Sequence, residues 1–126
     1  MAPAGVEMAL GVVRDPHLGP LVVVGAGGVL VELLADRSVR MAPMDEDGAR
    51  DAVARLRVSA LLDGVRGAPP ADRHALVGAV VAVSRLAAEL GEVLDAVDVN
   101  PLRCGPYGCL ALDALVEVRS PDTHGG

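Results

Sequence analysis

The sequence predicts an α+β domain in which a mostly antiparallel sheet is flanked by two helices. Three observations support this: strand-like alternation at both ends of the chain, two helix-like segments between them, and a hydrophobic share of 52% in 126 residues. A chain of this length can bury about two thirds of its unfolded surface, which suits one domain. Because the chain has no Phe, no Trp and one Tyr, its core must consist of Val, Leu, Ala and Met.

The first part of the sequence predicts four strands. Apolar residues alternate with other residues over positions 7–13, and the segment RDPHLGP that follows is typical of a turn. Residues 21–24, LVVV, form a short apolar run typical of a buried strand, and a further strand is expected over residues 29–34. Residues 39–44, VRMAPM, predict an edge strand, because a proline cannot donate a hydrogen bond to the sheet.

Two helices are predicted in the middle of the sequence. The first follows Asp45 or Asp47, either of which can cap it. Its apolar residues recur at helical spacing at Ala49, Val53, Leu56 and Ala60. The second, longer helix begins after a cap at Asp72 and ends near Leu90, with Gly91 as its C-terminal cap. Its apolar stripe is broad, which indicates that it lies across a sheet.

The last predicted elements are the two strands of a hairpin, residues 94–118, LDAVDVNPLRCGPYGCLALDALVEV. Asp98, Asn100 and Asp113 interrupt its apolar alternation. Because residues two apart in a strand share a face, Asp98 and Asn100 point the same way. A fold back at the CGPYG turn places Asn100 opposite Leu112 or Asp113. Three oxygen-bearing side chains are therefore expected in one patch.

The residues alone leave two interpretations of this patch open. In the first, the side chains face solvent and hold the hairpin together by cross-strand hydrogen bonds. In the second, they are half of a magnesium site, since Mg²⁺ takes one or two carboxylates and leaves other positions to water and substrate phosphates. Two carboxylates this close repel each other when both are charged. Either a bound cation offsets this repulsion, or one of the carboxylates stays protonated.

Charge and composition exclude several classes of partner. The net charge is −6 and all eleven basic residues are arginines, so a phosphate-clamping lysine must come from elsewhere. Without a basic stripe or a stacking platform of several aromatic side chains, nucleic acid is not an expected partner. Neither an apolar run of membrane-spanning length nor a secretory leader is visible, so no membrane contact and a cytoplasmic location are expected. The polar residues 119–126 predict a disordered tail.

The two cysteines, Cys104 and Cys109, flank the predicted hairpin turn. The four residues between them do not match the usual spacing of a zinc knuckle, and there is no second pair of ligands. A disulfide across the hairpin is one interpretation. Two reduced, half-buried thiols are the interpretation that a chain without secretory features favours.

Several segments follow one another along the chain in the order of a known family. They are GVEMALGVVRDPHLGP, VVVGAGGVLVELLADRSVRMAPM, LLDGVRGAPPADRHALV, and LDAVDVNPL followed by LALDALVEV. Together they resemble the second half of the ATP-grasp domain of NDP-forming acyl-CoA synthetases. These enzymes are relatives of the succinyl-CoA synthetase β subunit, and some are fused to a protein lysine acetyltransferase. The last pair of segments is the most specific, with an acidic-x-Asn-Pro-Leu strand and a later Asp.

The resemblance implies that residues 5–118 form the second lobe of an ATP-grasp fold. Such a lobe binds ATP or ADP with Mg²⁺ in an enzyme that interconverts acyl-CoA, ADP and phosphate with a free acid, CoA and ATP. The implied partners are the N-terminal ATP-grasp lobe and a CoA-binding domain or subunit, so the chain alone is expected to be inactive. Its uncovered apolar face favours self-association.

The resemblance also implies roles for individual residues. Asn100 and Asp113 correspond to the ligands of the nucleotide's Mg²⁺, and Asp98 and Glu7 correspond to acidic residues of the nucleotide site. Gly27 and Gly28 are implied to let the backbone turn beside the phosphates, although a plain turn explains them equally well. A dinucleotide-binding fingerprint is not met, because Leu occupies position 30.

Some roles and two alternative functions remain open. Arg40 and Arg66 either meet a phosphate or form surface ion pairs. Instead of an enzyme half, the chain could be a degenerate ATP-grasp module with a regulatory or interaction role in a lysine acetyltransferase. The third hypothesis is an unrelated small α+β module for binding or oligomerisation.

Overall fold

The computed structural model of this chain describes residues 5–27, 36–64 and 67–119. Its strands are β1 (Val6–Asp15), β2 (Gly19–Ala26), β3 (Arg37–Met41), β4 (Leu94–Gly105), β5 (Gly108–Ala111) and β6 (Ala114–Val118). Its helices are α2 (Glu46–Ala54), α3 (Ser59–Leu62) and α4 (Arg73–Leu90), and the short 3-10 helix η1 (Gly91–Val93) follows α4. The strand expected over residues 29–34 lies outside the described residues.

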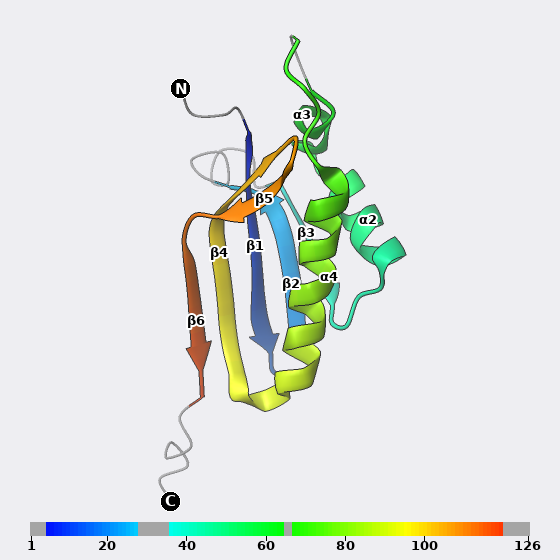
Figure 1. Cartoon of the computed structure of the whole chain (residues 1–126). Coiled ribbons are helices and arrows are strands. Elements are labelled where there is room, and N and C mark those ends of the chain that lie inside the picture. Colours follow the sequence, from blue (N-terminus) through cyan, green and yellow to red (C-terminus); the bar gives the residue numbers. More distant parts are fainter. Residues whose placement is uncertain (1–4, 28–35, 65–66, 120–126) are drawn as a thin grey trace, which may run out of the picture.

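The described strands form a six-stranded sheet in which every pair is antiparallel, in the order β3-β2-β1-β4-β5 (Figure 1). Strand β6 also pairs with β4. This is possible because β4 has 12 residues: its last part pairs with β5 and its first part with β6. The predicted α+β class with an antiparallel sheet is confirmed, but the predicted last strand is divided into two.

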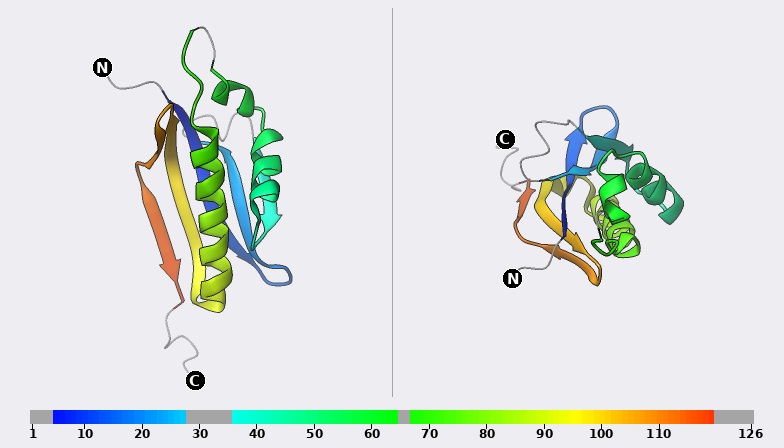
Figure 2. Two further views of the ribbon diagram at one scale, coloured as in Figure 1. Left: turned by 45° about the vertical axis from the view of Figure 1, so that its right-hand side comes forward. Right: turned by 90° about the horizontal axis from the view of Figure 1, so that it is seen from above.

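Helices α2 and α4 cover one face of the sheet, and no helix of the described residues covers the other face, called the open face below (Figure 2). Alternate residues of β1 and β2 point into the layer between sheet and helices, which is the core. The largest contributors are Met8, Leu10, Val12, Val22, Val24, Leu76 and Val80, each at most 2% exposed. As the composition predicts, this core is aliphatic, and the apolar stripe of α4 lies across the sheet.

The prediction for α4 is confirmed at both of its ends. The Asp72 side chain accepts a hydrogen bond from the Ala75 amide at 3.0 Å, which caps the first turn. Gly91 follows the last turn with a φ of 54°, a conformation that favours glycine. The guanidinium of Arg14 in β1 donates to the carbonyls of Gly91 and Leu94, so it satisfies acceptors just after the helix.

The prediction of one helix with Ala49, Val53, Leu56 and Ala60 on its face is wrong, because α2 ends at Ala54 and α3 begins at Ser59. The Asp36 side chain, at the start of β3, explains the break. Its carboxylate is 7% exposed and accepts hydrogen bonds from the amides of Arg57 at 2.8 Å and Val58 at 2.7 Å. These amides therefore bond to a carboxylate instead of continuing the α2 hydrogen-bond ladder.

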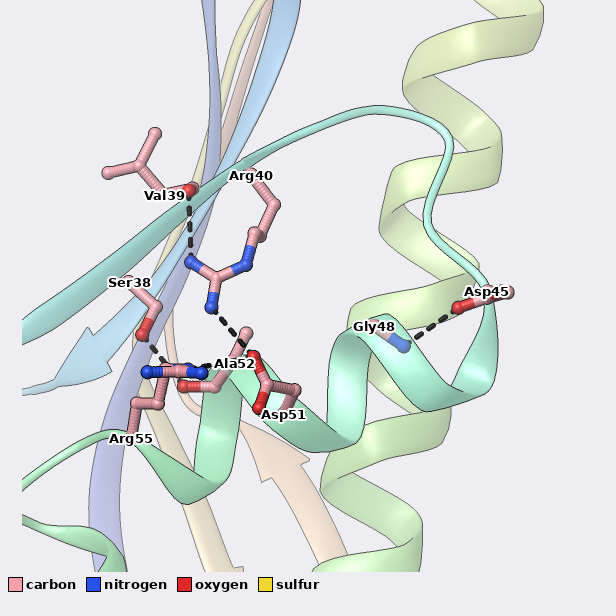
Figure 3. A network of polar contacts seen from close by, with 8 residues as sticks. All are labelled: Ser38, Val39, Arg40, Asp45, Gly48, Asp51, Ala52 and Arg55. Carbon is pink, nitrogen blue, oxygen red and sulfur yellow. Dashed lines mark hydrogen bonds and ion pairs between the residues drawn. The ribbon is translucent and has the colours of Figure 1, made fainter.

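Helix α2 is attached to β3 by the polar contacts in Figure 3. Arg40 forms an ion pair with Asp51 at 3.2 Å, and Asp51 also accepts from Arg55 at 2.8 Å. Hydrogen bonds from Arg55 and Arg40 lower the pKa of the Asp51 carboxyl. The Ser38 hydroxyl donates to the Ala52 carbonyl at 2.7 Å. Arg40 therefore takes the ion-pair role, whereas Arg66 lies outside the described residues.

Two further predictions concern the N-terminal cap of α2 and the C-terminal tail of the chain. Asp45, and not Asp47, caps α2, since its side chain accepts from the Gly48 amide at 2.7 Å (Figure 3). The Arg119 amide donates to the Val93 carbonyl at 2.7 Å, which places this first residue of the expected tail beside η1. Residues 120–126 lie outside the described part.

No helix among the described residues is long and apolar enough to cross a membrane.

Candidate functional site

The predicted pairing of Asn100 with Asp113 is present in the structure. The backbone amide of Asn100 donates to the backbone carbonyl of Asp113 at 3.1 Å, and the backbone amide of Leu112 donates to the backbone carbonyl of Pro101 at 3.0 Å. These two hydrogen bonds lie in the short link between β5 and β6, whose strands pair with β4 in the same register. The hairpin therefore places Asn100 and Asp113, from two segments of the chain, opposite each other at one point of the sheet.

A β-bulge lies at Asn100, which the sequence did not predict. Met8 of β1 pairs with Leu102, while Leu10 pairs with Val99, so Asn100 and Pro101 together face one residue of β1. The peptide bond between Asn100 and Pro101 is cis. A bulge of this kind interrupts the ladder and changes which face the following side chains take. As a result, Leu102 points into the core and is 5% exposed, although simple alternation from Asp98 would put it on the opposite face.

Asp98 lies on the open face of the sheet, which no described helix covers. It pairs with Gly11 of β1, whose neighbours Leu10 and Val12 point into the core on the other side. A groove of about 670 Å³ runs along this open face, and Asp98 is part of its wall. Gly11 lines this groove without a side chain, and a Cβ there would lie 2.7 Å from the Val97 carbonyl oxygen. The groove is also lined by Ala9, Val13, Leu21, Val23, Arg37, Val39, Ala96, Leu115 and Glu117.

Glu7 lies near the start of β1, apart from Asp98. It pairs with Arg103, and the two side chains form an ion pair at 3.9 Å, with 43% of the Glu7 side chain exposed. Glu7 is four positions along β1 from Gly11, the partner of Asp98, which corresponds to about 13 Å along the strand. Glu7 therefore lies on the other side of Asn100 from Asp98 and pairs with Arg103.

Gly27 has a structural role that the geometry explains. Its amide donates to the Glu7 carbonyl at 2.8 Å. A Cβ at this position would lie 2.4 Å from the Met8 carbonyl oxygen, so only glycine allows the chain after β2 to approach β1 this closely. Gly28 lies outside the described residues.

The donor set around Asn100 fits a cation that keeps much of its own solvation. Among residues 5–27, 36–64 and 67–119, no three His, Cys, Asp or Glu side chains gather into a metal site. The oxygen-bearing residues near this point of the sheet are Asn100, Asp113 opposite it and, two residues back along β4, Asp98. Mg²⁺ suits such a partial set, because it usually binds one or two carboxylates and retains water or phosphate oxygens. Asp113 and Asp98 are both exposed, so ligands can reach them from solvent.

Several residues of the open face were missed in the sequence. Leu115 and Glu117 lie two and four residues beyond Asp113, and continued alternation along β6 would have found them. Arg103 beside Glu7 could not have been found in this way, since the bulge changes the alternation before it. Arg37 was missed because β3 begins earlier than the predicted edge strand.

Comparison with known proteins shows the class of protein. A family model described as ATP-grasp domain matches residues 1–118, so the chain belongs to the ATP-grasp domain family. Curated relatives narrow this further. The chain is 38% identical over 114 residues to the acetate–CoA ligase [ADP-forming] I β subunit of Pyrococcus furiosus, covering 90% of this chain and 49% of the relative. It is 37% identical to the acetate–CoA ligase [ADP-forming] I of Archaeoglobus fulgidus, covering 90% of this chain and 16% of the relative.

Solved structures agree with these relatives. The dinucleotide forming acetyl-coenzyme A synthetase 1 of Ca. Korarchaeum cryptofilum, in complex with coenzyme A and Mg-AMPPCP, matches with a TM-score of 0.88 and 39% identity. The match covers 94% of this chain and 55% of that chain. The apo form of the same synthetase matches with a TM-score of 0.87, 39% identity, and coverage of 94% and 56%.

The chain is an ATP-grasp half-domain of the type found in ADP-forming acyl-CoA synthetases, and its sheet and helices correspond to one lobe of that fold. It spans about half the length of the Pyrococcus β subunit and about a sixth of the Archaeoglobus ligase. The family excludes the hypothesis of an unrelated α+β module. The relatives named here are ligases and synthetases, and nothing in them favours a module of a lysine acetyltransferase.

Proposed function

We propose that this chain forms one wall of a Mg-nucleotide site in an ADP-forming acyl-CoA synthetase. The complete enzyme would interconvert acyl-CoA, ADP and phosphate with a free acid, CoA and ATP. The observation that carries the proposal is the pairing of Asn100 with Asp113 at the bulge, beside the sheet face that no described helix covers. The similar Ca. Korarchaeum synthetase, whose complex contains coenzyme A and Mg-AMPPCP, supports it.

In this proposal Asn100 and Asp113 hold the Mg²⁺ through the amide and carboxylate oxygens. When bound, the ion neutralises charge on the nucleotide phosphates and helps to align them. Asp98, exposed on the groove wall, adds negative charge next to the ion. Glu7 and Gly27 lie at the same end of β1 and β2, and we assign them with Gly28 to the surroundings of the phosphates.

The open face of the sheet is the surface on which the other half of the ATP-grasp domain would lie. The groove there is lined mostly by apolar side chains, which a second lobe and the nucleotide would bury together. A CoA-binding domain or subunit would complete the enzyme. Without these partners the chain is expected to bind Mg-nucleotide weakly, to turn nothing over, and to self-associate through the open face.

The direct test replaces the carboxylate in the complete enzyme. Asp113→Asn removes one negative charge and should lower Mg-dependent turnover at least about a hundredfold, since even an indirect neighbour of a metal can be worth 10- to 100-fold. Asn100→Ala should have a similar effect. Glu89→Gln is the matched control, because it removes the same charge from the exposed side of α4, away from the sheet. Thermal melting should show that all three variants remain folded.

Nucleotide binding is tested separately by NMR. Mg-ADP, added to this chain in the presence of the other lobe, should shift the amide signals of residues 99–102 and 112–114. If these signals stay unchanged at millimolar nucleotide, or if folded Asp113→Asn enzyme keeps its Mg-dependent rate, the assignment of the metal site is wrong.

A further inference from the structure

A pair of thiols lies at the end of the β4–β5 hairpin, outside the proposed nucleotide site. Cys104 and Cys109 are directly opposite each other in the strand register, and both are free. Their Sγ atoms are 2.9 Å apart. A disulfide bond has an S–S length of about 2.05 Å, so bond formation requires an approach of less than about 1 Å. They are the two cysteines of the chain, so no other internal pairing competes.

The two thiols have different surroundings. Cys104 is 0% exposed within the apolar core, whereas Cys109 is half-buried and packs against the core from its edge. The hydrogen bond with Cys104 lowers the pKa of Cys109, although burial and the charge of Asp72 act in the opposite direction. The same hydrogen bond and burial raise the pKa of Cys104. Cys109 is therefore the accessible nucleophile, and Cys104 is the protected thiol behind it.

The hairpin end that contains these thiols is fixed to the rest of the fold. The turn at Pro106 and Tyr107 is closed by the pairing of Gly105 with Gly108. The Gly105 carbonyl accepts a hydrogen bond from the Asp72 amide at 2.6 Å, which attaches the hairpin to the start of α4. The two sulfurs are thus held next to each other by backbone contacts on both sides.

We propose that Cys104 and Cys109 form a reversible disulfide when the chain meets a low-molecular-weight disulfide. The Cys109 thiolate attacks one sulfur of the oxidant, forming a mixed disulfide and releasing one small thiolate. Cys104 then gives up its proton, and its sulfur attacks Sγ of Cys109, which releases the second small thiolate. Two protein thiols are oxidised and one small disulfide is reduced to two thiols. This inference does not depend on the proposed nucleotide site.

The bond would join β4 to β5 in the register that they already have. It therefore requires no rearrangement of the strands, and it restrains the hairpin whose other end places Asn100 opposite Asp113. Because the loop between the sulfurs is short, the gain in thermal stability should be small, and slower exchange of the β5 amides is the more sensitive readout.

The test uses the full chain, reduced and then incubated with oxidised glutathione. Intact-mass measurement should find a monomer lighter by about 2 Da, without a glutathione adduct, and dithiothreitol should restore the original mass. Cys104→Ala should stop at a stable glutathione adduct on Cys109. Cys109→Ala should give no adduct while folded, because Cys104 is buried, and should react once the chain is unfolded in urea.

Circular dichroism and thermal melting of the reduced variants establish that each one is folded, and Cys104→Ser replaces Cys104→Ala if the latter is not. The proposal is overturned if folded wild-type chain retains glutathione on Cys109, forms only disulfide-linked dimers, or does not react. It is equally overturned if folded Cys109→Ala reacts as fast as Cys104→Ala.

Discussion

Gly27, just after β2, and Gly78, within α4, lie in opposite surroundings. A Cβ on Gly27 would meet the backbone of β1, with the Met8 carbonyl oxygen at 2.4 Å. A Cβ on Gly78, in the middle of α4, would have no atom of the neighbouring structure within 4 Å. The first glycine is thus required by close packing of two backbone segments, whereas the second only weakens its helix.

We therefore predict opposite effects on stability for the same substitution at these two residues. Gly27→Ala should lower the free energy of unfolding by about 2 kcal/mol, because the backbone of β1 or of Gly27 must shift. Gly78→Ala should raise it by about 0.8 kcal/mol through helix propensity. Urea denaturation of both variants measures this difference. A stable Gly27→Ala variant would mean that the approach of this segment to β1 is not as close as described.

At the scale of the elements, β4 combines two tasks in one strand. Its residues before and after the bulge, such as Val97 and Leu102, point into the core, while Asp98 lies on the open face. The bulge at Asn100 separates the part that pairs with β6 from the part that pairs with β5. Asp98 reaches the open face by ordinary alternation, whereas the bulge redirects the strand so that Leu102 points back into the core.

The division between α2 and α3 provides a second prediction at this scale. Asp36→Ala should lower the free energy of unfolding by about 3 kcal/mol, since two backbone amides in a buried place lose their charged acceptor. Asp51→Ala is the control, as it removes a carboxylate that is exposed to solvent and forms surface ion pairs. Its effect should be much smaller. Equal effects in chemical denaturation would show that Asp36 does not determine the break.

At the scale of the whole molecule, the two faces of the sheet differ in kind. Helices cover one face, and the other has a groove with apolar side chains, of which Val13, Val39 and Leu115 are 50%, 44% and 58% exposed. An exposed apolar surface of this kind is typical of a face that another domain or subunit covers. This asymmetry agrees with a chain that spans about half of the Pyrococcus β subunit.

We predict that the isolated chain associates with itself through this open face. Val39→Lys, on the edge strand β3, should raise the dissociation constant about tenfold, since it puts a charge on the apolar groove. Leu18→Lys is the matched control, because Leu18 is 58% exposed in the turn after β1 and does not line the groove. Sedimentation velocity over a range of concentrations distinguishes the two. A uniform response to both variants would indicate association that depends only on net charge.

The features that could be predicted from the sequence depend on residues close together in the chain. Helix α4 has an apolar stripe within its own sequence and caps at Asp72 and Gly91. Its limits therefore followed from periodicity and capping. The opposition of Asn100 and Asp113 followed from a short turn, which allows few registers. Their roles as ligands stay predictions, because geometry alone does not identify what they bind.

Only the tertiary structure decided the features that depend on distant residues. Asp36 ends helix α2 by accepting hydrogen bonds from amides that lie 21 and 22 positions away in the sequence. No local sequence pattern predicts this. The bulge at Asn100 exists in relation to β1, and the groove exists because β1, β2, β3, β4 and β6 lie side by side. Local sequence thus determined helix α4 with its caps and the register of the hairpin. The assembly of remote segments determined where α2 ends, where β4 has its bulge, which face no described helix covers, and which side chains meet there.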